Sequence, residues 1–287
     1  MNPILNAAAC GRLALGGDLT INRLGFGAMR ITGAGAWGNP PDISMAVRVL
    51  RRAVNLGVNF IDTADAYGPN VSEDLLARAL YPYPADLVIA TKGGLVRPGP
   101  GDWVRDGRPV HLREACEASL KRLKRDRIDL YQLHAPDPAV PLEESVGELA
   151  RLRAEGKVRH IGVSNVSLPE LQRCERIVPV VAVQNRFNLQ DRSGEDVLEH
   201  CARRGTAFLP WAPLGSSGRG AGREAVPALA SLAERHGIST AQVAIAWLLQ
   251  RAPVVVPIPG TASMAHLEDN IAAAALVLTP EELRSLR

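Results

Sequence analysis

The sequence predicts a (β/α)8 barrel, formed by residues 1–287 as a single domain. Short apolar runs rich in β-branched residues recur eight times, as expected of strands that are buried on both faces. Amphipathic stretches with helical spacing alternate with these runs, which is the element order of a parallel α/β fold. A length of 287 residues suits one barrel of this kind.

Residues 12–22 (RLALGG-DLTIN) open the predicted fold with a hairpin that would cover the bottom of the barrel. Strands are expected at 23–28, 59–64, 87–93, 128–134, 159–165, 181–187, 207–213 and 254–260. Helices are expected at 43–57, 112–125, 142–156, 168–177, 195–205, 224–250 and 263–275. The first helix follows Asp42 and ends at Gly57, and both residue types are common at these helix ends.

A doubly wound sheet that binds a dinucleotide is the competing architecture. Such a sheet carries GxGxxG directly after an early strand and at the start of a helix, and no such motif occurs there. The glycine-rich loop of this chain is GSSGRGAG at 215–222, after the seventh predicted strand. Loops at this position often bind phosphate in barrels. A simple surface turn is the alternative interpretation of this loop.

Composition and charge narrow the class of protein. Hydrophobic residues make up 46% and charged residues 22% of the chain, as in ordinary globular proteins. The net charge of +3 gives no reason to expect a nucleic-acid or membrane partner. Neither CxxC nor HxxxH nor HExxH occurs, so no metal site is expected. The N-terminus lacks the pattern of a signal peptide, and no apolar run approaches the ~20 residues of a membrane span, so we expect a cytoplasmic protein.

Polar side chains that end apolar runs mark the candidate site. The stretch NFIDTADAYG at 59–68 ends a predicted strand with Asp62 and continues to Tyr67. The next two strands end in Lys92 (LVIATKG) and His134 (IDLYQLH). Active-site groups of barrels gather at the carboxyl ends of the strands, so these side chains are expected to meet. A buried Asp62 carboxylate needs a partner, and Lys92 is the cation that can supply it.

These four residue types point to acid–base chemistry on a carbonyl oxygen. A free tyrosine has a pKa near ~10, and a neighbouring lysine cation lowers that pKa by favouring the phenolate. Asp62 would keep Lys92 charged, while His134 would orient a carbonyl substrate beside the phenol of Tyr67. Structural alternatives stay open for each residue: an ion pair for Asp62 and Lys92, a loop aromatic for Tyr67 and a core histidine for His134.

The chain resembles the aldo-keto reductase superfamily over essentially its whole length. The matching stretches, in order, are NFIDTADAYG, IATKGG, DLYQLH, HIGVSN, VQNRFN, PWAPLG and PIPGTASMAHLEDN. GAMRITGAGAWG, ALYPY and PGTASMAHLEDN are also similar to bacterial members of the family that reduce pyridoxal. The resemblance implies NAD(P)(H)-dependent reduction of an aldehyde or ketone by hydride transfer. It further implies a catalytic set of Asp62, Tyr67, Lys92 and His134, with Tyr67 as the proton donor.

The resemblance also implies which residues bind the nicotinamide cofactor. Ser164, Asn165 and Gln184 would hold the nicotinamide carboxamide, and Trp211 would stack on the nicotinamide ring. Ala28, Met29 and Pro213 are further expected contacts of the cofactor. The backbone of Leu214, Gly215 and Ser216 would meet the pyrophosphate, and the residues toward the adenosine are Gly260, Thr261, Ser263, Asp269 and Asn270.

The loop after the eighth strand bears on the choice between NADP(H) and NAD(H). Many relatives carry a lysine or arginine there that binds the 2′-phosphate of NADP, whereas GTASMAHLEDN contains neither. Charge-assisted hydrogen bonds are stronger than neutral ones, but hydroxyl and amide groups at a helix start can also bind phosphate. NADP(H) is the expected cofactor, with NAD(H) as the alternative.

Trp37 and Trp103 lie in the long loops expected after the first and third strands. Together with Trp211 they would line one mouth of the barrel and accept a flat or aromatic aldehyde, unless they only pack within their own loops. The expected partner is a small-molecule carbonyl compound, bound by a monomer or weak oligomer. Two other functions stay open: a barrel lyase in which Lys92 forms a Schiff base, and a cofactor-binding regulatory subunit.

Overall fold

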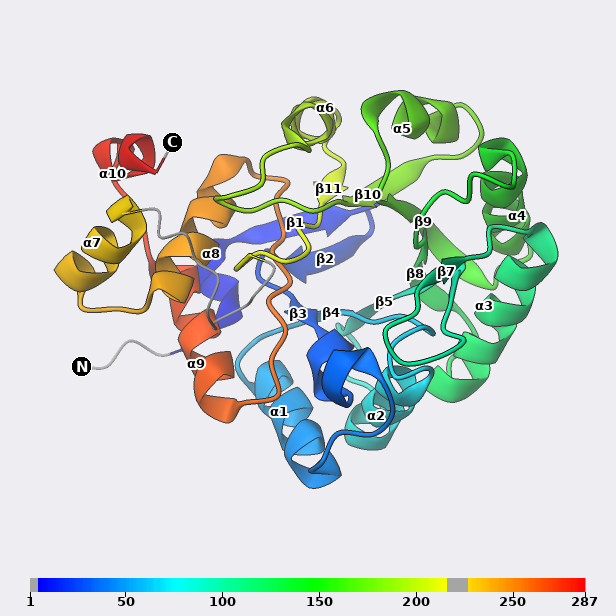
Figure 1. Cartoon of the computed structure of the whole chain (residues 1–287), viewed down its shortest axis with the longest axis horizontal. Helices are drawn as coiled ribbons and strands as arrows, with labels where there is room; N and C mark the ends of the chain where they lie inside the picture. The colour runs from blue at the N-terminus through cyan, green and yellow to red at the C-terminus, as the bar shows by residue number, and fades with distance from the viewer. Residues whose placement is uncertain (1–4, 216–226, 287) are drawn as a thin grey trace.

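The computed structural model describes residues 5–215 and 227–286. Its centre is a curled parallel sheet in the order β11-β10-β9-β8-β5-β4-β3, ringed by helices as in a (β/α)8 barrel (Figure 1). The strands are β3 (Phe26–Gly27), β4 (Phe60–Asp62), β5 (Val88–Gly93), β8 (Ile128–Leu133), β9 (Val158–Ser164), β10 (Val180–Gln184) and β11 (Ala207–Phe208).

Residues 254–257 close the barrel between β11 and β3 without forming a regular strand. The Phe208 N–H donates to the carbonyl of Val254 at 2.9 Å, and on the other side the Gly25 N–H donates to the carbonyl of Pro257 at 3.0 Å. The predicted strand at 254–260 therefore has its expected place but not its expected regularity. Pro257 and Pro259 explain the difference, because proline has no N–H to donate to a neighbouring strand.

Alternate strand residues point into the barrel or toward the helices. Phe60, Val88 and Leu130 share one buried cluster inside the barrel. Their neighbours Ile89 and Tyr131 belong to the two clusters that pack under the helices. This period of two is the geometry of an extended strand. It continues to the carboxyl ends of the strands, where the inward positions become polar.

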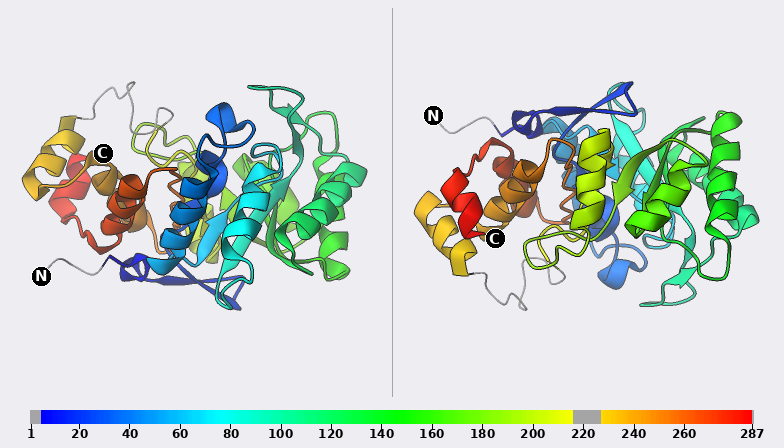
Figure 2. Two further views of the ribbon diagram at one scale, coloured as in Figure 1. Left: turned by 90° about the horizontal axis from the view of Figure 1, so that it is seen from below. Right: turned by 90° about the horizontal axis from the view of Figure 1, so that it is seen from above.

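The N-terminal hairpin of β1 (Arg12–Leu15) and β2 (Leu19–Asn22) is confirmed, and it covers the bottom of the barrel. Leu15 and Ile21 complete the inner cluster from below. The Asn22 N–H donates to Asn59 Oδ1 at 2.7 Å, just before β4 begins. Figure 2 shows the hairpin (dark blue) across one end of the barrel, opposite the loops that follow the strands.

The helices are α1 (Ile43–Asn55), α2 (Val71–Leu80), α3 (Pro109–Leu123), α4 (Leu142–Ala154), α5 (Leu168–Glu175), α6 (Glu195–Arg204), α7 (Pro227–His236), α8 (Thr240–Arg251), α9 (Met264–Ala272) and α10 (Pro280–Ser285). Short 3-10 turns are η1 (Ala7–Cys10), η2 (Ala28–Ile31), η3 (Ala34–Ala36) and η4 (Ala273–Ala275). In the part of the chain that the structure describes, no helix is both long and apolar enough to span a bilayer.

Several sequence expectations about elements were wrong or incomplete. Over the described residues 227–250, the single helix expected at 224–250 is two helices, because Gly237 adopts a φ of 63° and Ser239 caps a new helix, α8. The short helices α2 and α10 were not predicted. The loop after β5 contains a second hairpin, β6 (Leu95–Val96) with β7 (Val104–Arg105). The strands expected at 23–28 and 207–213 shrink to two residues each, β3 and β11.

Candidate active site

Strands β4, β5, β8 and β10 send polar side chains into the barrel near their carboxyl ends. These side chains are Asp62, Lys92, Gln132 and Gln184, and each is at most 3% exposed. Asp62 follows the inward Phe60 by two residues, and Lys92 likewise follows the inward Ala90. The period of a strand therefore brings these groups together in one layer above the apolar interior.

Lys92 is fully buried, and its ammonium group has three partners. Its Nζ donates to Asp62 Oδ2 at 2.6 Å, to the carbonyl of Thr63 at 2.9 Å and to the hydroxyl oxygen of Tyr67 at 3.2 Å. Burial disfavours the ammonium, but attraction by Asp62 and Tyr67 outweighs it, so the pKa of Lys92 lies above its ordinary value. A Schiff-base lyase needs a neutral amine, and this environment opposes one.

Asp62 uses its second oxygen to join two further strands to the site. Its Oδ1 accepts from Gln132 Nε2 at 3.1 Å and from Gln184 Nε2 at 2.8 Å. The buried carboxylate is thus paired with a cation and fully hydrogen-bonded, as a buried charge requires. The amide nitrogen of Gln184 holds Asp62, and the contact of Gln184 with the nicotinamide carboxamide stays a prediction. Gln132 was missed, although the alternation in DLYQLH places it on the same face as His134.

Tyr67 lies between Lys92 and two other rings. Its ring centroid is 5.8 Å from that of His134 and 6.4 Å from that of Trp103, edge to face in both cases. Burial raises the pKa of Tyr67 more than Lys92 lowers it, so the net pKa is above the ordinary value and not below it as expected from the sequence. The phenol therefore carries its proton at neutral pH.

His134 is a neutral imidazole. Burial and the nearby Lys92 cation hold the pKa of His134 well below its ordinary value. Its Nδ1 is buried and has no hydrogen-bond partner among the described residues. A buried ring nitrogen without a partner is a group that a bound ligand can satisfy.

Behind this site lies a second acidic pair that the sequence reasoning did not assign. Burial and repulsion by Glu73 raise the pKa of Asp65 to about 8. Glu73 accepts from Thr91 Oγ1 at 2.5 Å and from Arg122 Nε at 2.6 Å. Asp65 stands in the same NFIDTADAYG stretch as Asp62 and Tyr67. Both aspartates are buried, but Asp62 is paired with Lys92 whereas Asp65 lies near the Glu73 carboxylate, and the sequence alone does not show this difference.

The residues expected at the nicotinamide end come together above the strands. Asn165 has a left-handed φ of 58° and donates from Nδ2 to the carbonyl of His134 at 2.9 Å and to Ser164 Oγ at 3.1 Å. Its Oδ1 accepts from Trp211 Nε1 at 3.0 Å, which orients the indole ring. The Asn165 N–H donates to the carbonyl of Gln184 at 3.0 Å. A non-glycine residue in this backbone region is often found at functional sites.

The residues expected at the far end of the cofactor are partly brought together. Gly260 follows the closing segment, and a Cβ there would lie 2.3 Å from the carbonyl oxygen of Gly27, next to Ala28. The Thr261 hydroxyl accepts from the Ser263 N–H at 3.0 Å.

The other expected cofactor contacts stay predictions. The carboxylate of Asp269 holds the start of α8, since it accepts from Ser239 Oγ at 2.7 Å and from Gln242 Nε2 at 2.6 Å. Ser216 lies outside the described residues. The expected contacts that stay predictions are Met29, Pro213, Leu214, Gly215 and Asn270.

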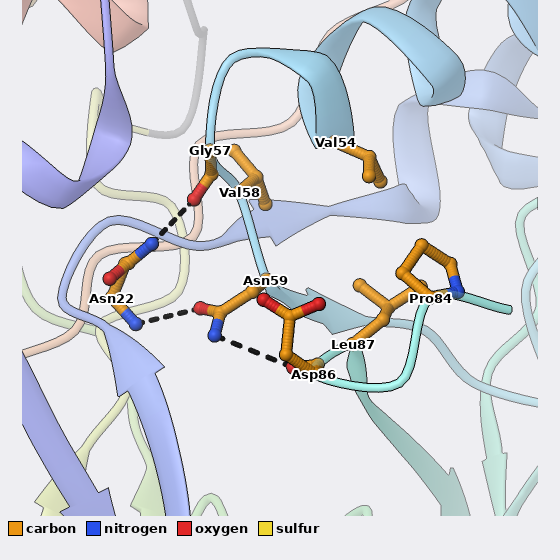
Figure 3. A pocket seen from close by; sticks show the side chains of 8 residues that line it. All are labelled: Asn22, Val54, Gly57, Val58, Asn59, Pro84, Asp86 and Leu87. Atoms are coloured by element: carbon orange, nitrogen blue, oxygen red, sulfur yellow. Dashed lines mark hydrogen bonds between the residues drawn. The ribbon is translucent and has the colours of Figure 1, made fainter.

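A hollow at the other end of the barrel is distinct from this site. Figure 3 shows the residues around it: Asn22, Val54, Gly57, Val58, Asn59, Pro84, Asp86 and Leu87. The side chain of Asn59 is engaged at both ends, since its Oδ1 accepts from the Asn22 N–H and its Nδ2 donates to the carbonyl of Thr20. These amides tie the hairpin to β4, which is a structural task. Among the described residues, no group of His, Cys, Asp and Glu is placed to hold a metal ion.

Comparison with known proteins identifies the chain's relatives. Residues 23–287 match the sequence model of the Aldo/keto reductase family. An uncharacterised oxidoreductase of Schizosaccharomyces pombe is 47% identical over 94% of this chain and 87% of its own length. Pyridoxine 4-dehydrogenase of Escherichia coli is 39% identical over 94% of this chain and 95% of its own length.

Solved structures agree with this match. An aldo/keto reductase from Klebsiella pneumoniae, crystallised with NADP and acetate, has a TM-score of 0.81 and 29% identity, covering 96% of this chain and 93% of its own. The glycerol dehydrogenase of Gluconobacter oxydans has a TM-score of 0.84 and 28% identity, covering 97% of this chain and 94% of its own.

Proposed function

The chain belongs to the aldo/keto reductase family, and on this premise we propose that it reduces an aldehyde or ketone to an alcohol, with Tyr67 as the proton donor. The single observation that carries the proposal is the contact of 3.2 Å between Lys92 Nζ and the Tyr67 hydroxyl oxygen. In this contact Lys92 donates, so the phenol's own proton stays available for a substrate.

The residues of the site suit the protonation of a developing alkoxide. A bound reduced nicotinamide supplies the hydride that converts the carbonyl carbon to an alcohol carbon. The carbonyl oxygen then gains negative charge, and the Tyr67 O–H donates its proton to that oxygen. The phenolate that Tyr67 would become is stabilised by the Lys92 ammonium, which Asp62 keeps in place. The neutral His134 would orient the carbonyl oxygen beside the phenol.

The arrangement around Asn165 supports the binding of a nicotinamide cofactor. The indole of Trp211 is held by Asn165, so its ring is already positioned to stack on another flat ring. Asn165 and Ser164 lie next to His134, where they can hydrogen-bond a carboxamide. We propose NADP(H) as the cofactor, supported by the NADP bound in the Klebsiella pneumoniae relative. NAD(H) stays the alternative, since the loop at 260–270 lacks lysine and arginine.

A flat aromatic aldehyde is the proposed substrate class, with pyridoxal as the first candidate. The name of the Escherichia coli relative supports pyridoxal, and the Trp103 ring beside Tyr67 supports a flat molecule. The remaining expectations, a cytoplasmic monomer or weak oligomer formed by one domain, stay predictions.

The test is to follow the absorbance of the reduced nicotinamide with a panel of aldehydes that includes pyridoxal, using NADPH and NADH in turn. We expect consumption with NADPH, faster with aromatic than with aliphatic aldehydes. Tight cofactor binding without turnover of any aldehyde or ketone would instead favour a regulatory subunit. Covalent trapping of substrate on Lys92 by borohydride would favour a lyase.

A further inference from the structure

Arg97 joins three separate chain segments at the mouth of the barrel. Its side chain is buried, at 8% exposure, and lies at the start of the loop after β5. The guanidinium donates to the carbonyls of Gly35 and Ala36 at 3.2 and 3.0 Å, in the loop after β3. It also donates to the carbonyl of Ala66 at 3.4 Å, one residue before Tyr67, and to the carbonyl of Asp102 at 2.6 Å.

The same guanidinium packs on two tryptophans from different loops. Its central carbon lies 3.8 Å from the Trp103 ring centroid and 5.5 Å from that of Trp37. Among the described residues, no carboxylate forms an ion pair with it at 4.0 Å or less. The charge of Arg97 is therefore directed to carbonyl oxygens and aromatic faces, which are the partners that a planar guanidinium suits best.

Trp103 in turn contacts the candidate catalytic rings. Its ring centroid is 6.4 Å from that of Tyr67 and 6.3 Å from that of His134. Trp103 is nevertheless 40% exposed, and the guanidinium of Arg97 packs against its ring. A side chain that is both exposed and adjacent to the reacting phenol is placed to contact a substrate.

We propose that Arg97 is a positioning residue that fixes Trp103 as a preformed wall of the substrate site and so favours flat aromatic aldehydes over short aliphatic ones. This inference rests on the proposed function and adds to it the residue that sets substrate preference. A wall that is ordered before binding spares an aromatic substrate the cost of ordering it. A short aliphatic aldehyde contacts little of the wall, so it gains little from Arg97.

Fixing Trp103 requires the planar guanidinium of Arg97 and not only its positive charge. The planar guanidinium of Arg97 donates hydrogen bonds to four carbonyl oxygens from three segments and also stacks on Trp103. A lysine offers a compact ammonium on a flexible stem and cannot make these contacts together. Arg97→Lys therefore separates the planar guanidinium from the charge, while Arg97→Met removes both. Arg105→Met, an exposed arginine in β7 of the same loop, is the matched control.

The experiment compares KM and kcat for benzaldehyde and butanal across these variants, with cofactor affinity from quenching of nicotinamide fluorescence. We expect Arg97→Lys and Arg97→Met to raise KM for benzaldehyde by about tenfold. This is the loss of affinity expected when one aromatic contact, here between the substrate and the Trp103 ring, is lost. KM for butanal, kcat and cofactor affinity should change by less than about twofold. Trp103→Leu should reproduce the loss with Arg97 intact, and Arg105→Met should behave as wild type.

Three outcomes would overturn the inference: equal changes in KM for both aldehydes, full rescue by lysine, or a Trp103→Leu variant that keeps its preference. If the wild type reduces no aldehyde or ketone of the wider panel, the proposed function fails separately. The wall is then tested by acrylamide quenching of tryptophan fluorescence, which should increase in Arg97→Met and not in Arg105→Met. Unchanged quenching would overturn the role of Arg97 independently of any turnover.

Discussion

The ammonium nitrogen of Lys92 lies 3.2 Å from the hydroxyl oxygen of Tyr67, and both side chains are buried. Burial keeps the phenol protonated, since the pKa of Tyr67 is raised by loss of solvent more than it is lowered by Lys92. The same cation stabilises the phenolate once the proton has left. Tyr67 is therefore protonated before the reaction, and its phenolate is stabilised after the proton has been transferred.

Tyr67→Phe tests the proton donor. We expect kcat for aldehyde reduction to fall by at least about 10²-fold, since that is the usual contribution of a general acid. Binding of the reduced cofactor, followed by quenching of its fluorescence, should be retained. A variant that keeps substantial reductase activity would refute the role of Tyr67.

Lys92→Met removes the cation and leaves Asp62 buried without its charged partner. We expect the free energy of unfolding to fall by about 3–5 kcal/mol, which is typical of a broken buried pair, and activity to be lost. The measurement is urea unfolding followed by circular dichroism.

The double variant Asp62→Asn, Lys92→Met is the control for this pair. It removes both charges, so it should recover part of the lost stability while remaining inactive. If the double variant were no more stable than Lys92→Met, the cost would not come from an uncompensated carboxylate.

Asp65→Asn tests the buried acid behind the site. The pKa of Asp65 is raised from 3.8 to about 8 in the folded protein, so the folded state binds the proton more tightly than the unfolded state. The contribution of Asp65 to the free energy of unfolding is fully present below pH 3.8, and it is lost as the pH rises from 3.8 to about 8. Within this window the free energy of unfolding should fall by on the order of 1.4 kcal/mol per pH unit. Asp65→Asn should flatten the decline of the unfolding free energy over this window, and an unchanged decline would show that Asp65 does not cause it.

Gly27→Ala tests the closure of the barrel. A Cβ on Gly27 would lie 2.6 Å from the carbonyl oxygen of Ile258, which is backbone and cannot move aside cheaply. We expect a loss of about 1–3 kcal/mol in the free energy of unfolding. Gly147→Ala is the matched control, because Gly147 lies inside α4 with nothing within 4 Å of a new Cβ. That variant should be more stable by about 0.5–1 kcal/mol.

Much of the fold could be predicted because each strand carries its own local pattern. The apolar runs of β4, β5, β8, β9 and β10 are long enough to be recognised alone. The eighth strand shows the limit of this approach. Its apolar residues satisfy the strand pattern, but Pro257 and Pro259 interrupt the hydrogen bonding. Helix α2 is short, and its start at Asn70 has no side-chain cap, so it left little signal.

The candidate site could be predicted as far as it follows the strand ends. Asp62, Lys92 and His134 end their strands, and the structure brings them together with Tyr67. The net pKa of Tyr67 could not be predicted, because it depends on how much solvent is removed by the whole fold. Arg97 could not be assigned either. Its partners are backbone carbonyls in three loops, and backbone atoms carry no residue-specific signal.

The hairpin β1–β2 closes the bottom of the barrel. Leu15 and Ile21 fill the space below the inner apolar layer, and Asn22 bonds to Asn59 at the rim of this end. The polar layer around Lys92 lies at the opposite end of the barrel, on the side of Tyr67, His134 and Trp103, so a ligand of this site is expected to approach from that end.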